Sequence, residues 1–310
     1  MQKSTHNKVM RNGIINIYKE AGFTSHDVVA KLRGILHQKK IGHTGTLDPA
    51  AVGVLPVCLG KATKLCDMIG DWKKTYEAVM LLGVETDTED TTGQILSEKP
   101  VEVGEEALIE IMNSFLGDYD QVPPMYSAKK QNGKKLYELA RAGITVERKP
   151  CRVHIFSLEI LSMDLPYVRF RVTCSKGTYI RSLCRDIGIK AGTVACMKEL
   201  KRTDVEAFHE TDSLTLAQVE DLRDQDQLDQ VIVPIDAAFA DLSRVDVISQ
   251  GEKKLYNGNA LPKRYLRLEE ELIPGRRYRV YDWKNQFIGV YDYQEETGEL
   301  KPYKLFFDFA

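Results

Sequence analysis

Residues 42–49 read Gly-His-Thr-Gly-Thr-Leu-Asp-Pro and form the most unusual stretch of this 310-residue chain. Gly42 and Gly45 permit tight backbone turns, and Pro49 fixes the backbone directly after Asp48. An isolated Asp-Pro pair, however, is more often an ordinary turn whose carboxylate caps backbone N–H groups. The stretch therefore allows two interpretations, a chemically active aspartate or a structural turn.

On both sides of this loop, strand patterns alternate with helix patterns. Thr24 and Asp27 form a capping-box pattern, which predicts a helix that begins at this point. From about residue 245, short β-like runs lie between turns such as Asn257-Gly258, which predicts a separate β-rich module. Further along the chain, alternation and helical spacing predict strands at 73–83, 151–161 and 167–175 and helices at 104–116, near 134–142 and at 179–189.

The composition excludes several classes of protein. With 43% hydrophobic and 28% charged residues, the chain is too apolar to be disordered and too charged to be a membrane bundle. Its longest nearly apolar stretch, residues 50–60, is broken by Pro56, and residues 1–11 lack the apolar core of a secretory signal. The six cysteines form no CxxC pair. We therefore expect a cytoplasmic protein with reduced thiols.

The near-neutral net charge of −2 conceals strong regional differences. Residues 125–154 carry eight basic and two acidic side chains, whereas residues 210–246 carry two basic and ten acidic ones. A basic segment that contains Tyr126 and Tyr137 is suited to follow a phosphate backbone while its rings stack on bases. A solvated surface segment is the alternative, and charge alone favours it.

Common phosphate-binding and metal-binding motifs are missing from the sequence. Gly60-Lys61 is followed by Ala62, which does not complete a phosphate-binding loop, and no HExxH occurs. Asp87, Glu89 and Asp90 lack the spacing of an EF-hand loop. We therefore expect no metal and no cofactor, and chemistry that side chains perform alone.

Five ordered segments resemble the TruB family of tRNA pseudouridine synthases. The first is the run 40–56, KIGHTGTLDPAAVGVLP, which includes the loop described above. The other four are residues 13–33 (with Gly22-Phe23-Thr24-Ser25), 74–78 (KTYEA), 175–183 (SKGTYIRSL) and 197–203 (MKELKRT). Five motifs in the right order seldom coincide by chance, so the chain is identified as a member of this family.

The resemblance implies that the chain isomerises the T-loop uridine at tRNA position 55 without a cofactor. Asp48 matches the family's catalytic aspartate, Tyr76 its active-site tyrosine and Arg181 its active-site arginine. A guanidinium favours the ionised carboxylate that a nucleophile needs, whereas burial alone disfavours it. Attack at C1′, attack at C6 and an elimination all remain open to Asp48.

The resemblance also implies residues that line the pocket. His43, Tyr179, Leu200 and Lys19 match such positions, although each also fits a purely structural role. We expect His43 to replace contacts that the flipped base gives up. Glu20 stands where the family usually has proline, which leaves the role of Lys19 open.

The implied fold is α+β, with a mixed, mainly antiparallel central sheet, flanking helices and an inserted clamp segment. We expect a catalytic domain at residues 1–244, with a basic RNA-clamp insertion at about 123–152. Residues 245–310 resemble a small β-rich PUA-type RNA-binding domain. The clamp candidates are Lys129, Lys130, Lys134 and Arg141.

Two other functions remain open. The chain could be a tRNA-folding chaperone without catalysis, or a related synthase that acts on another RNA. A chaperone derived from the enzyme could have lost Asp48 or Arg181, and both are present. We therefore expect a catalytic monomer that binds the T-loop and elbow of tRNA, without an obligate protein partner.

Overall fold

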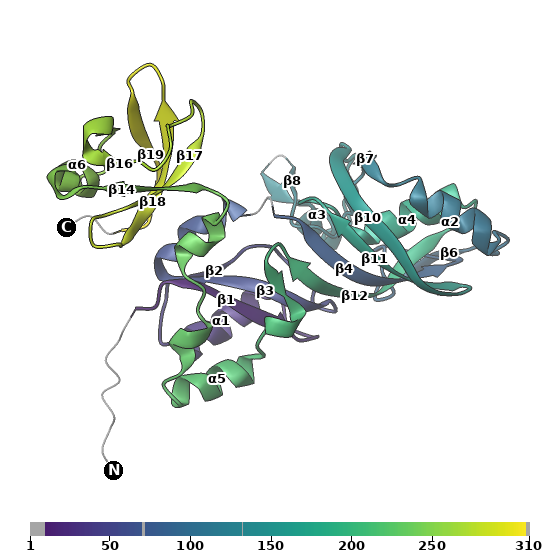
Figure 1. The fold of residues 1–310 in the computed structure, drawn as a ribbon. Helices are drawn as coiled ribbons and strands as arrows, with labels where there is room; N and C mark the ends of the chain where they lie inside the picture. Colours follow the sequence, from purple (N-terminus) through teal and green to yellow (C-terminus); the bar gives the residue numbers. More distant parts are fainter. Residues whose placement is uncertain (1–9, 70–71, 132, 308–310) are drawn as a thin grey trace, which may run out of the picture.

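A computed structural model describes residues 10–69, 72–131 and 133–307, which form two sheets with flanking helices (Figure 1). The larger sheet has nine strands, in the order β1-β3-β12-β4-β11-β10-β7, with β2 paired to β3 and β13 paired to β12. All neighbours are antiparallel except β3 and β12. Its strands are β1 (Gly13–Lys19), β2 (Ile41–His43), β3 (Val52–Leu59), β4 (Lys74–Leu82), β7 (Gly117–Gln121), β10 (Cys151–Asp164), β11 (Tyr167–Cys174), β12 (Ala195–Val205) and β13 (Phe208–His209).

One half of this sheet packs against α4 (Ile180–Lys190) and α2 (Glu105–Asn113). The apolar side chains of α4 recur at helical spacing, and Leu183 and Ile187 are fully buried against strand residues such as Met80 and Phe170. Burying side chains of this size contributes about 2 kcal/mol each, before conformational entropy is counted. This packing holds the first turn of α4, which carries Arg181, over the centre of the sheet.

The other half of the sheet packs against α1 (Ser25–Ile35) and α5 (Leu216–Asp224). The predicted capping box is confirmed: Thr24 Oγ1 accepts a hydrogen bond from the backbone N–H of Asp27, whose carboxylate accepts one from the N–H of Thr24. Val28 and Leu32 then face Ile15 and Ile17 of β1 in one apolar cluster. The start of α1 is therefore fixed beside the loop that follows β2.

Gly53 allows the parallel contact between β3 and β12. Its φ of +106° lies in a region that other residues rarely adopt, and an added Cβ would lie 2.2 Å from the Arg202 carbonyl oxygen. Because Gly53 is directly opposite Arg202 in the strand register, the missing side chain lets the two backbones approach. This contact sets the position of β3, which follows the Asp48 loop.

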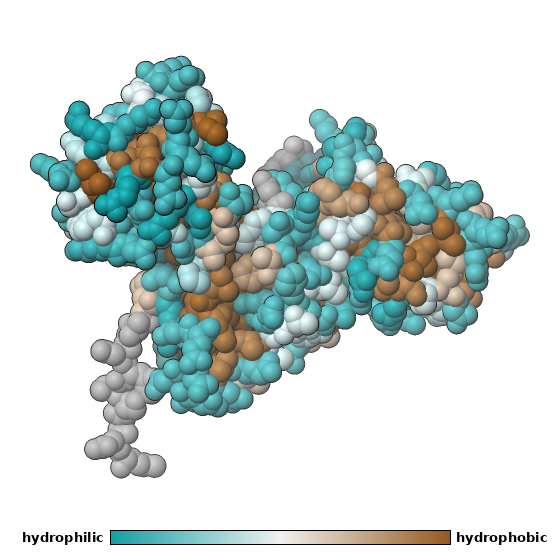
Figure 2. Space-filling model, in the orientation of Figure 1, coloured by the Kyte–Doolittle hydropathy of each residue, from teal (hydrophilic) through white to brown (hydrophobic). Residues whose placement is uncertain are grey.

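The second sheet has the order β15-β19-β18-β17-β14-β16. It is not isolated from the first, because Val290 and Phe306 share an apolar cluster with Ile14, Val54 and Phe239. Figure 2 shows a largely hydrophilic surface over this module. Its elements are β14 (Ser243–Val247), α6 (Glu252–Tyr256), β15 (Leu261–Pro262), β16 (Leu266–Arg267), β17 (Arg277–Tyr281), β18 (Phe287–Gln294) and β19 (Glu299–Leu305).

The predicted fold class is confirmed, and most predicted segments agree with the structure to within three residues at each end. The helix predicted near 134–142 is shorter: it is α3 (Leu136–Arg141), and residues 134–135 instead belong to a two-stranded ribbon, β8 (Lys130–Gln131) with β9 (Lys134–Lys135). Gly133, with a φ of +82°, lies in the connection between these strands and breaks the helical pattern. A second ribbon pairs β5 (Val84–Thr86) with β6 (Ile95–Glu98).

Candidate active site

The loop that carries Asp48 joins β2 to β3 and is held by backbone contacts to the start of α1. Ser25 is fully buried, and its hydroxyl accepts a hydrogen bond from the Leu47 N–H at 2.9 Å. The Pro49 carbonyl accepts one from the Gly22 N–H at 3.0 Å, and the Asp48 carbonyl accepts one from the Ala51 N–H at 3.1 Å. The turn is therefore stabilised without the Asp48 carboxylate, which is available for another partner.

That partner is Arg181, 133 residues away in the sequence. Its Nε lies 3.0 Å from Asp48 Oδ2 and its Nη2 lies 3.3 Å from Oδ1, so the guanidinium contacts both carboxylate oxygens. Arg181 also donates to the carbonyls of Thr88 and Tyr126, each at 2.9 Å. The arginine side chain is 6% exposed and that of Asp48 is 38% exposed. One carboxylate therefore reaches solvent from a buried, rigid support.

Two opposing effects set the charge of Asp48. Burial is the largest and raises the pKa of the carboxyl, while the Arg181 guanidinium lowers it. Asp90 also raises this pKa, and Lys19 lowers it. The net direction is upward, so the arginine offsets only part of the effect of burial. Such a perturbed carboxylate beside a buried guanidinium is typical of a catalytic group.

Asp90 belongs to the loop between β5 and β6 and lies at the edge of this charge cluster. Its Oδ2 is 3.8 Å from Arg181 Nη1, while its Oδ1 accepts hydrogen bonds from the Thr88 and Thr92 hydroxyls and the Thr92 N–H. Asp90 thus orders the loop whose Thr88 carbonyl holds Arg181. Its contact with Arg181 itself is long.

Tyr76 lies on β4 between β11 and β12, with only 7% of the residue exposed. Arg202 is directly opposite Tyr76 in the strand register. Burial raises the pKa of the phenol above its usual value, Arg202 opposes that rise, and Asp48 is near enough to add to it. Tyr76 is therefore a neutral phenol at pH 7, and it lies close enough to Asp48 for that carboxylate to affect its pKa.

His43 ends β2 and makes an edge-to-face contact with His26, with ring centroids 5.3 Å apart. Burial lowers the pKa of His43 to about 4, and His26 and Arg202 add to this effect. Its Nδ1 is buried, with no hydrogen-bond partner in the described part of the chain. His43 is therefore neutral and has a ring nitrogen ready for another polar group.

Tyr179 and Leu200 lie on two elements that border this site, α4 and β12. Tyr179 is the N-cap of α4, and its backbone N–H and carbonyl both bond to the Gln121 side chain, at 2.8 and 3.0 Å. Leu200 is half-buried on β12 and packs against the larger core cluster. Both placements suit a pocket wall and a structural position equally.

Lys19 is fully buried beneath the Asp48 loop. Its ammonium donates to the carbonyls of Glu20, Phe23 and Pro49, at 3.2, 2.6 and 3.2 Å. Burial lowers the pKa of Lys19 to about 8, although Asp48 opposes that change. These contacts hold the loop, so Lys19 acts on Asp48 through backbone position and charge.

The basic insertion lies beside the site and is connected to it. Lys130 and Lys134 are exposed on the β8–β9 ribbon, and Arg141 is exposed with its guanidinium 5.4 Å from the Tyr137 ring centre. Lys129 is half-buried, and its ammonium contacts Cys151 Sγ. Because the Tyr126 carbonyl accepts a hydrogen bond from Arg181, this segment contributes directly to the support of that side chain.

Two features of the site were not predicted from the sequence. Arg202, within the quoted run 197–203, is fully buried beneath the Asp48 loop, and only its place in that motif pointed to it. Glu89 bonds the Ser182 hydroxyl at 2.6 Å and pairs with Arg185, which fastens the β5–β6 loop to α4. No local sequence pattern relates Glu89 to Ser182 or Arg185, because both lie more than 90 residues from it.

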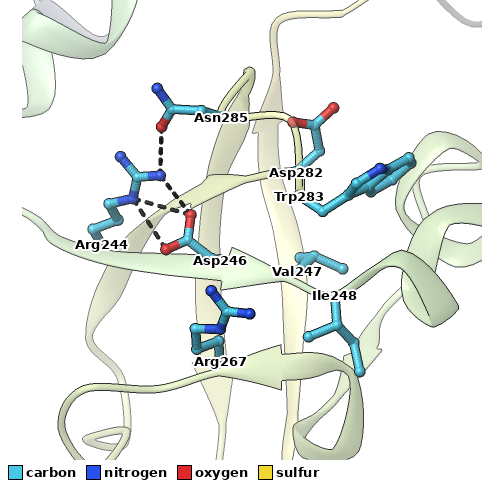
Figure 3. Close-up of a pocket in the computed structure, with 8 residues that line it drawn as sticks. All are labelled: Arg244, Asp246, Val247, Ile248, Arg267, Asp282, Trp283 and Asn285. Atoms are coloured by element: carbon cyan, nitrogen blue, oxygen red, sulfur yellow. Dashed lines mark hydrogen bonds and ion pairs between the residues drawn. The ribbon is translucent and has the colours of Figure 1, made fainter.

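A surface pocket lies elsewhere, in the second sheet (Figure 3). It encloses about 170 Å³, and Arg244 on its edge is paired with Asp246 and Asn285. It is lined by Arg244, Asp246, Val247, Ile248, Arg267, Asp282, Trp283 and Asn285. None of the predicted catalytic residues lines it.

Searches of the described residues give two further findings. No helix among them is long and apolar enough to span a membrane. No group of three or more His, Cys, Asp or Glu side chains within the same ranges is arranged to hold a metal ion.

Comparison with known proteins matches most of the chain to one family. Residues 33–180 match the N-terminal domain of TruB family pseudouridylate synthase, and residues 181–240 match the tRNA pseudouridylate synthase B C-terminal domain. The tRNA pseudouridine synthase B of Lachnoclostridium phytofermentans is 50% identical over 95% of this chain and 99% of that protein. The protein of the same name from Clostridium acetobutylicum is 46% identical over 93% and 98%, respectively.

Solved structures agree with this match. A Cbf5–Nop10–Gar1 complex contains a chain that is 28% identical, with a TM-score of 0.72 over 95% of this chain and 85% of that one. An H/ACA RNP bound to a substrate RNA contains one that is 26% identical, with a TM-score of 0.71 over 96% and 86%. The similarity therefore extends over both sheets.

Proposed function

Because the chain belongs to the TruB family of pseudouridine synthases, we propose that it converts the T-loop uridine at tRNA position 55 to pseudouridine. The observation that carries the proposal is the half-exposed Asp48 carboxylate, held through both oxygens by the buried Arg181. The curated relatives that are 43–50% identical are all named tRNA pseudouridine synthase B.

The reaction is an isomerisation that the side chains perform without a cofactor. The N1–C1′ bond breaks, a C5–C1′ bond forms, the C5 proton is lost and N1 gains a proton. The uridine must first leave the stacked loop, and the unpartnered Nδ1 of His43 is suited to contact groups that the base leaves behind. Asp48 then acts as the nucleophile, which requires its ionised form.

Tyr76 supplies an aromatic ring for the flipped base and a hydroxyl for proton transfer. Two observations support this role: the phenol is neutral, and the Asp48 carboxylate is near enough to raise its pKa. Tyr179 and Leu200 would form walls of the pocket, and Lys19 would keep the loop in place through its three carbonyl contacts.

We further propose that residues 123–152 clamp the T-loop arm through Lys129, Lys130, Lys134 and Arg141. The exposed cations of the β8–β9 ribbon and α3 support this proposal. We propose a catalytic domain at 1–244 and a PUA-like RNA-binding domain at 245–310, which the separate six-stranded sheet supports. The enzyme would act in the cytoplasm as a monomer.

A synthase that acts on another RNA is the second candidate, because the similar solved chains come from H/ACA and Cbf5 complexes. The higher identity to the tRNA enzymes favours tRNA. A chaperone without catalysis is disfavoured by the intact Asp48–Arg181 pair.

The deciding experiment measures tritium release from an unmodified tRNA transcript that carries 5-tritiated uridine. We expect one equivalent per tRNA, and none when the T-loop uridine is replaced by cytidine. Release that persists after this replacement would assign the enzyme to another site. Binding without release would support the chaperone.

A further inference from the structure

Arg202 is the largest fully buried side chain of the described residues, with 1% of the residue exposed. Its Nε donates to the Val54 carbonyl at 2.7 Å and its Nη2 to the Gly45 carbonyl at 3.3 Å. Within the ranges that the structure describes, no carboxylate lies at ion-pair distance from it. Burying a charge without an opposite charge is costly, so this position calls for an explanation beyond packing.

The guanidinium lies between two parts of the active site. Gly45 belongs to the catalytic loop, three residues before Asp48, and an added Cβ there would lie 3.5 Å from Arg202 Nη1. On the opposite side, Arg202 is directly opposite Tyr76 in the strand register, and its guanidinium is close enough to the phenol to oppose the rise in its pKa. Arg202 thus bonds to the Asp48 loop and lies beside the active-site tyrosine.

We propose that Arg202 is a positioning residue for the isomerisation, fixing the Tyr76 oxygen and the Gly45 carbonyl in one geometry. The Tyr76 ring, which lies beneath the flipped base, and the loop that carries Asp48 are then held at a fixed distance and orientation. A planar guanidinium has five N–H donors in a rigid fork and can serve three acceptors at once. This role exists only in an enzyme of the proposed function, on which the inference rests.

The charge of Arg202 has a second consequence. Because no carboxylate neutralises it, its field acts on the phenol, where it opposes the rise in pKa that burial causes. It also lowers the pKa values of Lys19 and His43. Replacing Arg202 by a neutral residue should therefore raise the pKa of Tyr76 further.

The kinetic test uses Arg202→Lys and single-turnover reactions with saturating enzyme. A lysine keeps the charge but places its three donors at one point, so it cannot reach Val54, Gly45 and Tyr76 together. We expect the rate to fall about 100-fold, as for a misplacement of about 1 Å, with the tRNA Kd unchanged within about 3-fold. Arg223→Lys is the matched control, because Arg223 also donates to a backbone carbonyl, that of Ile35, and should keep the full rate.

A double-mutant cycle separates positioning from general damage. If Arg202 acts through the phenol oxygen, Arg202→Lys should slow the Tyr76→Phe enzyme much less than it slows the wild type. Equal effects in both backgrounds would overturn the proposal, as would a wild-type rate in Arg202→Lys.

Magnetic resonance provides a test that requires neither activity nor a folded Arg202 variant. In protein with ¹⁵N-labelled arginine, Tyr76→Phe should shift a single protected guanidinium signal, that of the buried arginine beside the phenol. No shifted signal would refute the contact. A shifted signal in a protein that releases no tritium would leave the contact in place and reject the proposed function instead.

Discussion

Arg181–Asp48, beside the larger sheet, and Arg244–Asp246, in the second sheet, are both arginine–aspartate pairs, but they differ in sequence separation and in exposure. Arg181 and Asp48 are 133 residues apart, and the arginine is 6% exposed. Arg244 and Asp246 are two residues apart on one strand, and their side chains are 42% and 30% exposed (Figure 3). A solvated pair between sequence neighbours contributes little to stability. Burying a guanidinium has a high desolvation cost, even when its carboxylate partner, far away in the sequence, is in direct contact.

The difference shows where function is to be sought. Beside the first sheet, the Arg181 guanidinium of α4 bonds to three separate segments. These are the β2–β3 loop, the β5–β6 loop and the basic insertion. In the second sheet, the pocket of Figure 3 is lined by Asp246, which is paired with the neighbouring Arg244, and by Asp282, whose carboxylate accepts hydrogen bonds from two backbone N–H groups. The pocket of Figure 3 is therefore separate from the cluster of buried charge around Arg181.

The largest expected effect comes from Asp48→Asn. This change removes the nucleophile and leaves Arg181 bonded to the Thr88 and Tyr126 carbonyls, so the fold and RNA contacts should persist. We expect tritium release to fall by about 10⁴-fold or more, with tRNA binding within about 3-fold of the wild type. Asp246→Asn, the same change in the exposed pair, should keep the single-turnover rate. Product formation by Asp48→Asn at a comparable rate would reject Asp48 as the nucleophile.

A smaller effect is expected from Arg181→Lys, which should also change the pH dependence. Lysine cannot contact both Asp48 oxygens and two carbonyls together, so we expect the rate to fall about 100- to 1000-fold. Lysine keeps the positive charge but loses the paired hydrogen bonds to the Asp48 carboxylate, which also lower its pKa, so the pKa of Asp48 should be modestly higher in the variant. Activity requires the ionised carboxylate and is lost as the pH falls through that pKa. The acid limb of the single-turnover profile should therefore move to higher pH.

This prediction has a clear opposite outcome. If the acid limb of Arg181→Lys coincides with that of the wild type, the paired hydrogen bonds of Arg181 do not contribute to the ionisation of Asp48. The loss in rate would then come from a distorted loop. Circular dichroism of both proteins would show whether the fold is retained.

The sequence predicted the helices and strands far better than the long-range side-chain contacts. The capping box of α1 and the apolar spacing of α4 are local patterns, so they could be read directly. The pairing of Arg181 with Asp48 was expected only through the family resemblance. The hydrogen bonds of Lys19 and Arg202 to backbone carbonyls could not be predicted, because a buried cation without a carboxylate partner leaves no periodic signal in a sequence.

The smallest expected effect concerns RNA binding by the insertion and extends the comparison to exposed cations. Lys130, Lys134 and Arg141 are exposed and have no carboxylate partner among the described residues, in contrast to Arg244. If they contact phosphates, replacing all three by alanine should weaken tRNA binding about 10-fold or more at physiological salt. It should also lower the slope of log Kd against log salt by about two to three.

Arg244→Ala removes a cation whose charge Asp246 already offsets, so its effect on the slope should be smaller. Equal slopes for the triple variant and the wild type would exclude phosphate contacts by the insertion, and its link to the active site through the Tyr126 carbonyl would then be purely structural.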